Sequence, residues 1–225
     1  MSDFLKTAQQ LLYNVNFDLD VKNELTILSN YNYFELVLEL DSDEEKITFW
    51  VNIYNAYYQL LAKKNQTKSI FKERKINIAN KLFSLDTIEH GILRKGKYII
   101  GFGYLHNPFY SDYIKKLQVN VLDFRIHFAL NCGAVSCPPI LFYEFNKINE
   151  QLKLATSSFI ETGTTINSNK KILEISKLFL WYKGDFGSNL KIKQIIGTIF
   201  NQNFKYYHLK FKEYNWKKKL NNFTD

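Results

Sequence analysis

The chain is poor in cysteine, proline, glycine and arginine, and each shortage limits what the protein can be. Two cysteines, Cys132 and Cys137, are too few for a disulfide framework. Three prolines and nine glycines leave little material for a flexible linker. With 225 residues, of which 46% are hydrophobic, we expect a single domain over residues 1–225.

Long apolar runs are also missing. No stretch approaches the roughly 20 apolar residues that span a bilayer. The N-terminus lacks the basic-then-apolar order of a signal peptide. We therefore predict no membrane span and a cytoplasmic location, where reducing conditions keep both cysteines as free thiols.

The chain is basic, with a formal net charge of +8, but the positive charge comes almost entirely from lysine. Only Arg74, Arg94 and Arg125 are arginines. Arginine is the side chain that reads bases and clamps phosphates with two hydrogen bonds, so nucleic acid is an unlikely partner. A small molecule or a peptide remains as the expected substrate, of unknown identity.

The hydrophobic pattern predicts an α+β class, with mixed helices around a mostly antiparallel sheet. The apolar residues recur at three- and four-residue steps in five segments, for which we predict helices: 2–15, 42–64, 84–93, 149–159 and 190–200. We predict strands at 119–130 and 204–211, and a hairpin over 165–175. Residues 25–40 fit either state. The first 44 residues are expected to pack on the rest as a helical part.

The densest chemistry lies at 123–139. A thiol becomes a strong nucleophile when an imidazole or a positive potential lowers its pKa, and His127 precedes both cysteines by a few residues. Cys132 is the favoured nucleophile because Gly133 and Ala134 follow it with backbone amides that could hold an oxyanion. Cys137 is the second choice, since Pro138 supplies no amide donor. Equally, both cysteines could be small buried hydrophobes in a tight turn.

Two further polar residues accompany this thiol pair. Arg125 could hold a substrate carboxylate with two hydrogen bonds, or pair with an acid of the core. Asn131 could orient the histidine or contact the substrate. His127, Cys132 and Cys137 could instead ligate a metal, but their H-x4-C and C-x4-C spacings are wide for zinc. We assign no metal and no cofactor.

A second constellation lies at 86–94. On an α-helix, Asp86 and His90 share a face at i,i+4, whereas Glu89 and His90 point in different directions. An acid beside an imidazole fixes its tautomer, as a catalytic base requires. The base is therefore either His127 or His90, oriented by Glu89, Asp86 or Asn131. A surface helix with an ordinary Asp–His contact is the plainer interpretation.

A third segment, 49–56, places Asn52 and Asn55 inside an apolar helix. Buried amides need partners. The favoured interpretation is that they pin neighbouring loops, and the alternative is that Asn52 or Asn55 orients a histidine or donates to a substrate carbonyl. We expect this helix to be central, with Phe49 or Trp50 largely buried.

Four motifs follow one another in order: 49–56, 88–94, 125–139 and 181–187, with a closing segment at 214–221. Together they resemble the signature of the "domain of unknown function 547" family, over about residues 45–221. Asn215 stands where that family more usually has Asp. The family brings no established reaction; it includes stand-alone bacterial proteins and plant proteins with coiled coils.

The residues themselves favour a thiol-dependent enzyme that acts on an acyl or amide bond, such as a peptidase, an amidase or an acyltransferase. The alternative is a non-catalytic module that binds a peptide or a glycan, in which the motif residues only brace the fold. We expect Asp185 to cap the turn at 184–187. We also expect Glu89 and His90 to lie close to the 131–137 turn, because these polar motifs otherwise lack partners.

Overall fold

The centre of the fold is a long buried helix, α4 (Asp43–Lys63), in a computed structural model that describes residues 2–64, 70–98 and 100–223. Ser42 begins it with a capping box: its hydroxyl accepts from the Glu45 amide, while the Glu45 carboxylate accepts from the Ser42 amide. Phe49 and Trp50 are completely buried. The predicted central helix is therefore confirmed.

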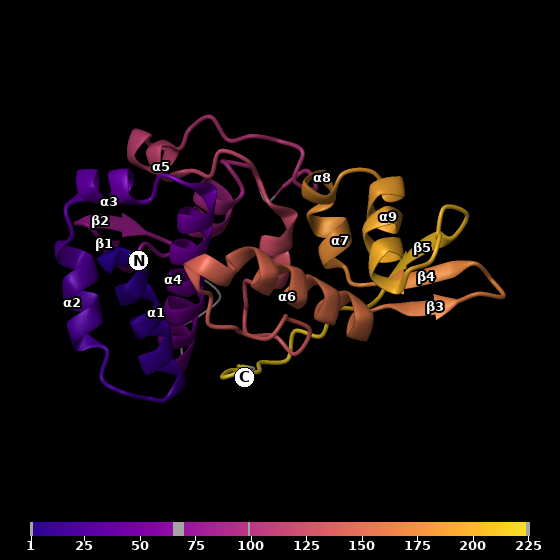
Figure 1. The fold of residues 1–225 in the computed structure, drawn as a ribbon, viewed down its shortest axis with the longest axis horizontal. Coiled ribbons are helices and arrows are strands. Elements are labelled where there is room, and N and C mark those ends of the chain that lie inside the picture. The colour runs from indigo at the N-terminus through magenta and orange to yellow at the C-terminus, as the bar shows by residue number, and fades with distance from the viewer. Residues whose placement is uncertain (1, 65–69, 99, 224–225) are drawn as a thin grey trace.

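The remaining elements lie on either side of α4 and α6 (Figure 1). The other α-helices are α1 (Asp3–Asn16), α2 (Lys22–Asn30), α3 (Tyr33–Glu39), α5 (Asp112–Leu117), α6 (Ile148–Gly163), α7 (Leu178–Trp181), α8 (Lys183–Phe186) and α9 (Asn189–Phe200). The π-helix η1 (Thr87–Leu93) and the 3-10 helices η2 (Phe124–Phe128) and η3 (Phe145–Lys147) are the other helical elements within the described ranges. Helices α1 to α4 gather at one end, and α7 to α9 at the other.

Two hydrophobic cores correspond to these two ends. The first core surrounds α4 and takes in α1, whose Leu5, Leu11 and Leu12 are buried against it. The second core joins α6, α8 and α9 and includes Phe128 and Phe186. The predicted N-terminal helix is confirmed, and residues 25–40 are helical. None of the helices in the described ranges is both long and apolar enough to cross a bilayer.

Strands are few and short, which confirms the α+β class. β1 (Ile76–Ile78) pairs antiparallel with β2 (Lys81–Phe83) beside α2. At the other end, β3 (Thr165–Asn167) and β4 (Ile172–Ile175) form the predicted hairpin, and β5 (His208–Phe211) adds to β4 in parallel. Most pairings are thus antiparallel, and the two small sheets lie at the ends of the molecule.

The strand predicted over 119–130 is wrong. Asp123 accepts a hydrogen bond from the Arg125 amide through its side chain, and its carbonyl accepts from Ile126. Such a local side-chain bond competes with extended backbone, so the chain turns into η2. Its β-branched and aromatic residues serve packing instead: Ile126 enters the first core and Phe128 the second.

Two amides of α4 fix the loops that follow η2. Asn55 donates to the Ala129 carbonyl at 3.0 Å and accepts from the Asn131 amide at 2.9 Å. Asn52 makes the same pair of bonds with the backbone of Tyr143, at 2.8 and 3.2 Å. Both asparagines are completely buried. They pin neighbouring loops, as the favoured interpretation of the sequence predicts.

The C-terminal tail closes over the same loops. Val135 donates to the Lys217 carbonyl at 2.9 Å, and Lys219 donates to the Gly133 carbonyl at 2.7 Å. Further along, the Ile140 amide donates to the Asn222 carbonyl. The tail is therefore hydrogen-bonded to the segment that carries both cysteines, from Gly133 to Ile140.

Replacing Asn55 by alanine is expected to lower the free energy of unfolding by about 2–4 kcal/mol, because it leaves two buried backbone groups unpaired. Urea denaturation measures this loss. The matched control is Asn146→Ala at an exposed site, which is expected to stay within about 0.5 kcal/mol of the natural chain. Equal effects of the two substitutions would contradict the pinning role of Asn55.

Candidate functional site

The helix that carries Glu89 and His90 is wound as a π-helix. The Arg94 amide donates to the Glu89 carbonyl at 2.8 Å, and the Gly96 amide donates to the Gly91 carbonyl at 3.0 Å, both five residues back. A wider turn rotates successive side chains by less than an α-helix does, and such turns are frequent at functional sites. Glu89 and His90 consequently border the same cavity, so the prediction that they point in different directions is wrong.

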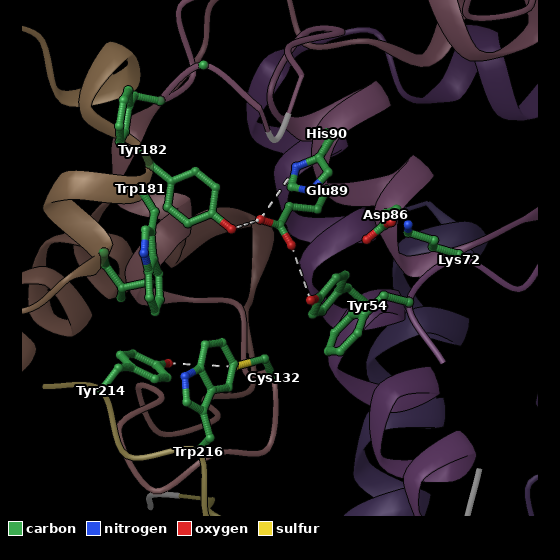
Figure 2. A pocket seen from close by; sticks show the side chains of 14 residues that line it. Tyr54, Lys72, Asp86, Glu89, His90, Cys132, Trp181, Tyr182, Tyr214 and Trp216 are labelled. Atoms are coloured by element: carbon green, nitrogen blue, oxygen red, sulfur yellow. Dashed lines mark hydrogen bonds and ion pairs between the residues drawn. The ribbon is translucent and has the colours of Figure 1, made fainter. Parts of the chain in front are cut away.

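This cavity, called the main cavity below because it holds both motif residues, has a volume of about 520 Å³ and lies between α4, η1, α7 and the C-terminal tail. Figure 2 shows Glu89 and Tyr54 on one side of it and Trp181 on the other. Cys132 also lines it. The expectation that Glu89 and His90 lie near the 131–137 turn is thereby confirmed.

Glu89 is buried, and two phenols hold its carboxylate. The Tyr182 hydroxyl donates to Oε1 at 2.7 Å and the Tyr54 hydroxyl donates to Oε2 at 3.2 Å (Figure 2). Burial acts to raise the pKa of Glu89, whereas attraction to His90 and His127 when they are protonated, the Tyr182 hydrogen bond and Arg94 act to lower it, and the net direction is downward. Where the two rings are neutral, the Tyr182 and Tyr54 hydroxyls and Arg94 still favour the ionised form of Glu89.

His90 contacts both an arginine and an acid. Arg94 Nη1 lies 3.0 Å from His90 Nδ1, and Glu89 Oε1 lies 3.6 Å from the same nitrogen. A guanidinium only donates, so Nδ1 accepts from Arg94 and the proton of the neutral ring sits on Nε2. Burial lowers the pKa of His90, which keeps the ring neutral. The predicted neighbour Glu89 therefore lies beside the ring, and Arg94 is a partner that the sequence does not predict.

Asp185 is the centre of a buried charge network. Its carboxylate accepts from Arg94 Nε at 2.6 Å and from Lys97 Nζ at 2.9 Å, and it lies 2.8 Å from His127 Nε2. The side chain is 0% exposed. Burial alone would raise the pKa of Asp185, but the bonds to His127 and Arg94 hold it well below its usual range.

The loop beside this network approaches it closely. At Gly103, which has φ +79°, a Cβ would lie 2.7 Å from Arg94 Nη2 and 2.8 Å from Asp185 Oδ1. Only glycine fits there without displacing the ion pair. Asp185 thus does more than cap the 184–187 turn, because it joins η1, η2 and α8.

His127 is held by Asp185 and stacks on Tyr182, with ring centroids 3.9 Å apart. Burial lowers the pKa of His127 despite the opposing effect of Asp185. The ring borders a second, smaller cavity of about 40 Å³, which Cys132 and Cys137 also line. That volume is enough for a water molecule.

The two cysteines form a disulfide bond, so the prediction of two free thiols is wrong for this structure. The Tyr214 hydroxyl lies 3.2 Å from Cys137 Sγ and 3.6 Å from Cys132 Sγ. The Cys132 amide also donates to Cys137 Sγ, at 3.2 Å. The turn between the cysteines brings their sulfurs together, which their spacing in the sequence does not reveal.

The backbone amide expected to hold an oxyanion at Gly133 is already engaged. It donates to Asn131 Oδ1 at 2.8 Å, and Asn131 donates in turn to the Pro138 carbonyl. At Gly133, with φ +69°, a Cβ would collide with the ring of Tyr58. The glycine therefore allows close approach to Tyr58 rather than to a ligand.

Three predicted substrate-binding residues lie away from the main cavity. Arg125 pairs with Asp123, with Nε 2.9 Å from Oδ2, and contacts Asn149. Asn52 and Asn131 are completely buried and use their amides on backbone groups. Their side chains brace the fold, and nothing in this geometry supports contact with a substrate.

The sequence does not predict the aromatic residues of the site. Tyr54, Tyr182, Tyr214 and Trp216 carry no pattern of their own among 15 tyrosines and 3 tryptophans. Their presence inside or beside the family-like motifs is the one signal that could have found them. Within the described ranges, no three histidine, cysteine or acidic side chains are grouped as a metal site. His127 faces Asp185 instead.

Comparison with known proteins identifies a family but no reaction. A family model described as "Protein of unknown function, DUF547" matches residues 38–160. No curated protein matches the chain. No solved structure matches it either.

Replacing Asp185 by asparagine is expected to lower the free energy of unfolding by about 3–5 kcal/mol, because it leaves buried cations without their counter-ion. The matched control is Asp41→Asn at an exposed position, with an expected change within about 0.5 kcal/mol. Urea denaturation at pH 7 compares the two. A loss for Asp185→Asn no larger than that of the control would show that the network contributes little.

Acid is expected to destabilise the fold in two stages. His90 and His127 have a lowered pKa in the folded state, so the unfolded chain binds more protons once the pH falls below about 6.5. Asp185, with its lowered pKa, adds a second loss below about 3.8. Urea unfolding between pH 7 and pH 2.5 is expected to show a fall in the free energy of unfolding below about pH 6.5 and a further fall below about pH 3.8. A rise on acidification would contradict these shifts.

Proposed function

Since the chain belongs to the DUF547 family, whose description assigns no reaction, we propose a function from the site itself: a thiol-dependent enzyme that acts on an acyl or amide bond. Cys132 is the nucleophile once the bond to Cys137 has been reduced. The observation that carries the proposal is that Cys132 and the Asp185-bound His127 line one small cavity, which adjoins the main cavity at Cys132.

The choice of Cys132 over Cys137 follows from access. Cys132 is half-buried and lines the main cavity, where a substrate could reach it. Cys137 is only 6% exposed. Tyr214 contacts both sulfurs and can donate a hydrogen bond to a thiolate. Reduction by a cellular dithiol would convert the disulfide to two thiols, and the reductant would become a disulfide.

His127 is the base in this proposal. A neutral imidazole held by a carboxylate is the arrangement that activates a nucleophile, and the 2.8 Å contact with Asp185 supports it. The lowered pKa keeps His127 unprotonated and able to accept a proton at neutral pH. A water in the 40 Å³ cavity can carry the proton from Cys132 to the ring.

The proposed reaction begins when His127 takes the thiol proton and the sulfur of Cys132 attacks the carbonyl carbon of the substrate. The bond to the leaving amine or alcohol breaks, His127 returns the proton to it, and a thioester remains on Cys132. A water or another acceptor then gives its proton to His127 and attacks the thioester carbonyl. The carbon–sulfur bond breaks, the acyl group leaves on the acceptor, and His127 returns the proton to the Cys132 sulfur.

One observation favours the second candidate, a binding module for a peptide or a glycan. The disulfide occupies both sulfurs, and Trp216, which lines the main cavity with Trp181 and Tyr214, is 64% exposed to solvent. Such a module needs the cavity but no thiol. The two candidates therefore differ in whether reduction of the disulfide produces a reactive group.

Iodoacetamide labelling distinguishes them. The variant Cys137→Ser frees Cys132 without a reductant, and at pH 6 we expect it to label at least about tenfold faster than the same variant unfolded in urea. The oxidised natural chain should not label. The variant Cys132→Ser, which leaves the buried Cys137 thiol, is the matched control and should label slowly.

Acylation gives the second measurement. After dialysis against a chelator, which removes metals that also deprotonate thiols, Cys137→Ser should gain one acyl group from p-nitrophenyl acetate in an intact mass spectrum. Cys132→Ser should not. Labelling no faster than in the unfolded chain, together with no acyl adduct, would overturn the enzyme proposal and leave the binding module.

A further inference from the structure

Glu89 has no task in the proposed reaction, yet it is an ionised carboxylate in a buried position, with a side chain 11% exposed. Its oxygens accept from the phenols of Tyr54 and Tyr182, and Oε1 lies 3.6 Å from Nδ1 of His90, a ring that is neutral while Nδ1 accepts from Arg94. Arg94 is committed to Asp185 and to His90 Nδ1. Buried charges in proteins are normally paired, so the Glu89 carboxylate is available as the counter-ion of a bound cation.

The opposite side of the main cavity is an aromatic wall made of Trp181, Tyr214 and Trp216 (Figure 2). The ring centroids of Tyr214 and Trp216 are 4.6 Å apart, and those of Trp181 and Tyr214 are 4.9 Å apart. Trp181 and Trp216 complete the set at 5.5 Å. Ring faces attract cations, most strongly tryptophan, and clusters of such rings recognise alkylated ammonium groups.

The other charges at the cavity leave this attraction in place. Asp86 and the exposed Lys72 lie next to each other at one edge (Figure 2). Their opposite charges offset one another. His90 is neutral, as its contact with Arg94 requires. The cavity therefore presents one net negative charge, on Glu89, to a space walled by aromatic rings.

We propose that the main cavity binds an organic cation, an alkylated ammonium group seated between the Glu89 carboxylate and the aromatic wall of Trp181, Tyr214 and Trp216. Cys132 lines the same cavity. If the cation is part of an acyl substrate, the inference rests on the proposed function. The cation-binding site itself does not depend on that function, because no thiol takes part in binding.

Choline and its neutral isostere 3,3-dimethylbutan-1-ol provide the test, since they share size and shape and differ in charge. Binding is measured at pH 7 by calorimetry and by quenching of tryptophan fluorescence, on the natural chain with its disulfide intact. Choline is expected to bind at least about tenfold more tightly than the isostere. The measurement involves no turnover, so its outcome is independent of the labelling and acylation results.

Variants identify the two halves of the site. Glu89→Gln keeps the shape of the side chain and is expected to remove the preference for choline over the isostere. Glu150→Gln, the same change at an exposed position, should leave it intact. Trp216→Leu changes an exposed residue, so folding is not at risk, and it is expected to weaken choline binding about threefold to tenfold.

Three results would overturn the proposal. The first is equal binding, or no binding, of choline and the isostere. The second is a preference for choline that survives in a folded Glu89→Gln variant. The third, which applies even if Glu89→Gln does not fold, is choline binding unchanged by Trp216→Leu. Choline binding by a protein whose Cys137→Ser variant shows neither fast labelling nor an acyl adduct would instead support the cation site and refute the enzyme.

Discussion

The Asp185 carboxylate determines how the two halves of this protein meet. It is completely enclosed, and its three partners come from separate segments: Arg94 after η1, Lys97 from the following loop, and His127 from η2. A carboxylate in such a position is tolerated only when donors satisfy it. The neighbouring residues of η1 belong to the first core, whereas Phe186, next to Asp185, belongs to the second. The network therefore fixes the relative position of the two cores at the site.

The same network sets the protonation of the site. Because Arg94 donates to His90, the proton of that ring is confined to Nε2. Because Asp185 lies against His127 Nε2, that ring is oriented as a base requires. Both rings have a lowered pKa through burial. Asp185 thus leaves Nδ1 of His127 able to accept a proton, and Arg94 leaves the Nε2 proton of His90 able to be donated.

The sequence predicts the parts of the fold that depend on local periodicity. The apolar spacing of α1, α4 and α9 identifies these helices, and the polar Asn52 and Asn55 inside α4 point correctly to partners in distant loops. Local patterns fail where a side chain redirects the backbone. Asp123 converts a β-rich segment into η2 through bonds to the residues that follow it.

The site is less predictable, for physical reasons. The π-helical winding of η1, which turns Glu89 and His90 to one cavity, leaves no mark in the residue pattern. The pairing of Asp185 with Arg94 joins residues 91 positions apart, and the turn that brings the cysteine sulfurs together depends on contacts with Asn131 and the tail. Residue types therefore identify candidates, whereas their partners depend on tertiary packing.

The residues proposed for catalysis and those of the aromatic wall lie in different parts of the chain. Residues 38–160, which match the family, contain Cys132, His127 and Glu89. The aromatic wall and Asp185 lie beyond that segment, in α7, α8 and the tail. Trp216 lies in a stretch of the tail that Asn215, Lys217 and Lys219 hydrogen-bond to the cysteine turn. The tail therefore connects the two proposals physically: Tyr214 contacts both sulfurs and is also one ring of the wall. A ligand that packs against this ring lies, by the same contact, beside Cys132.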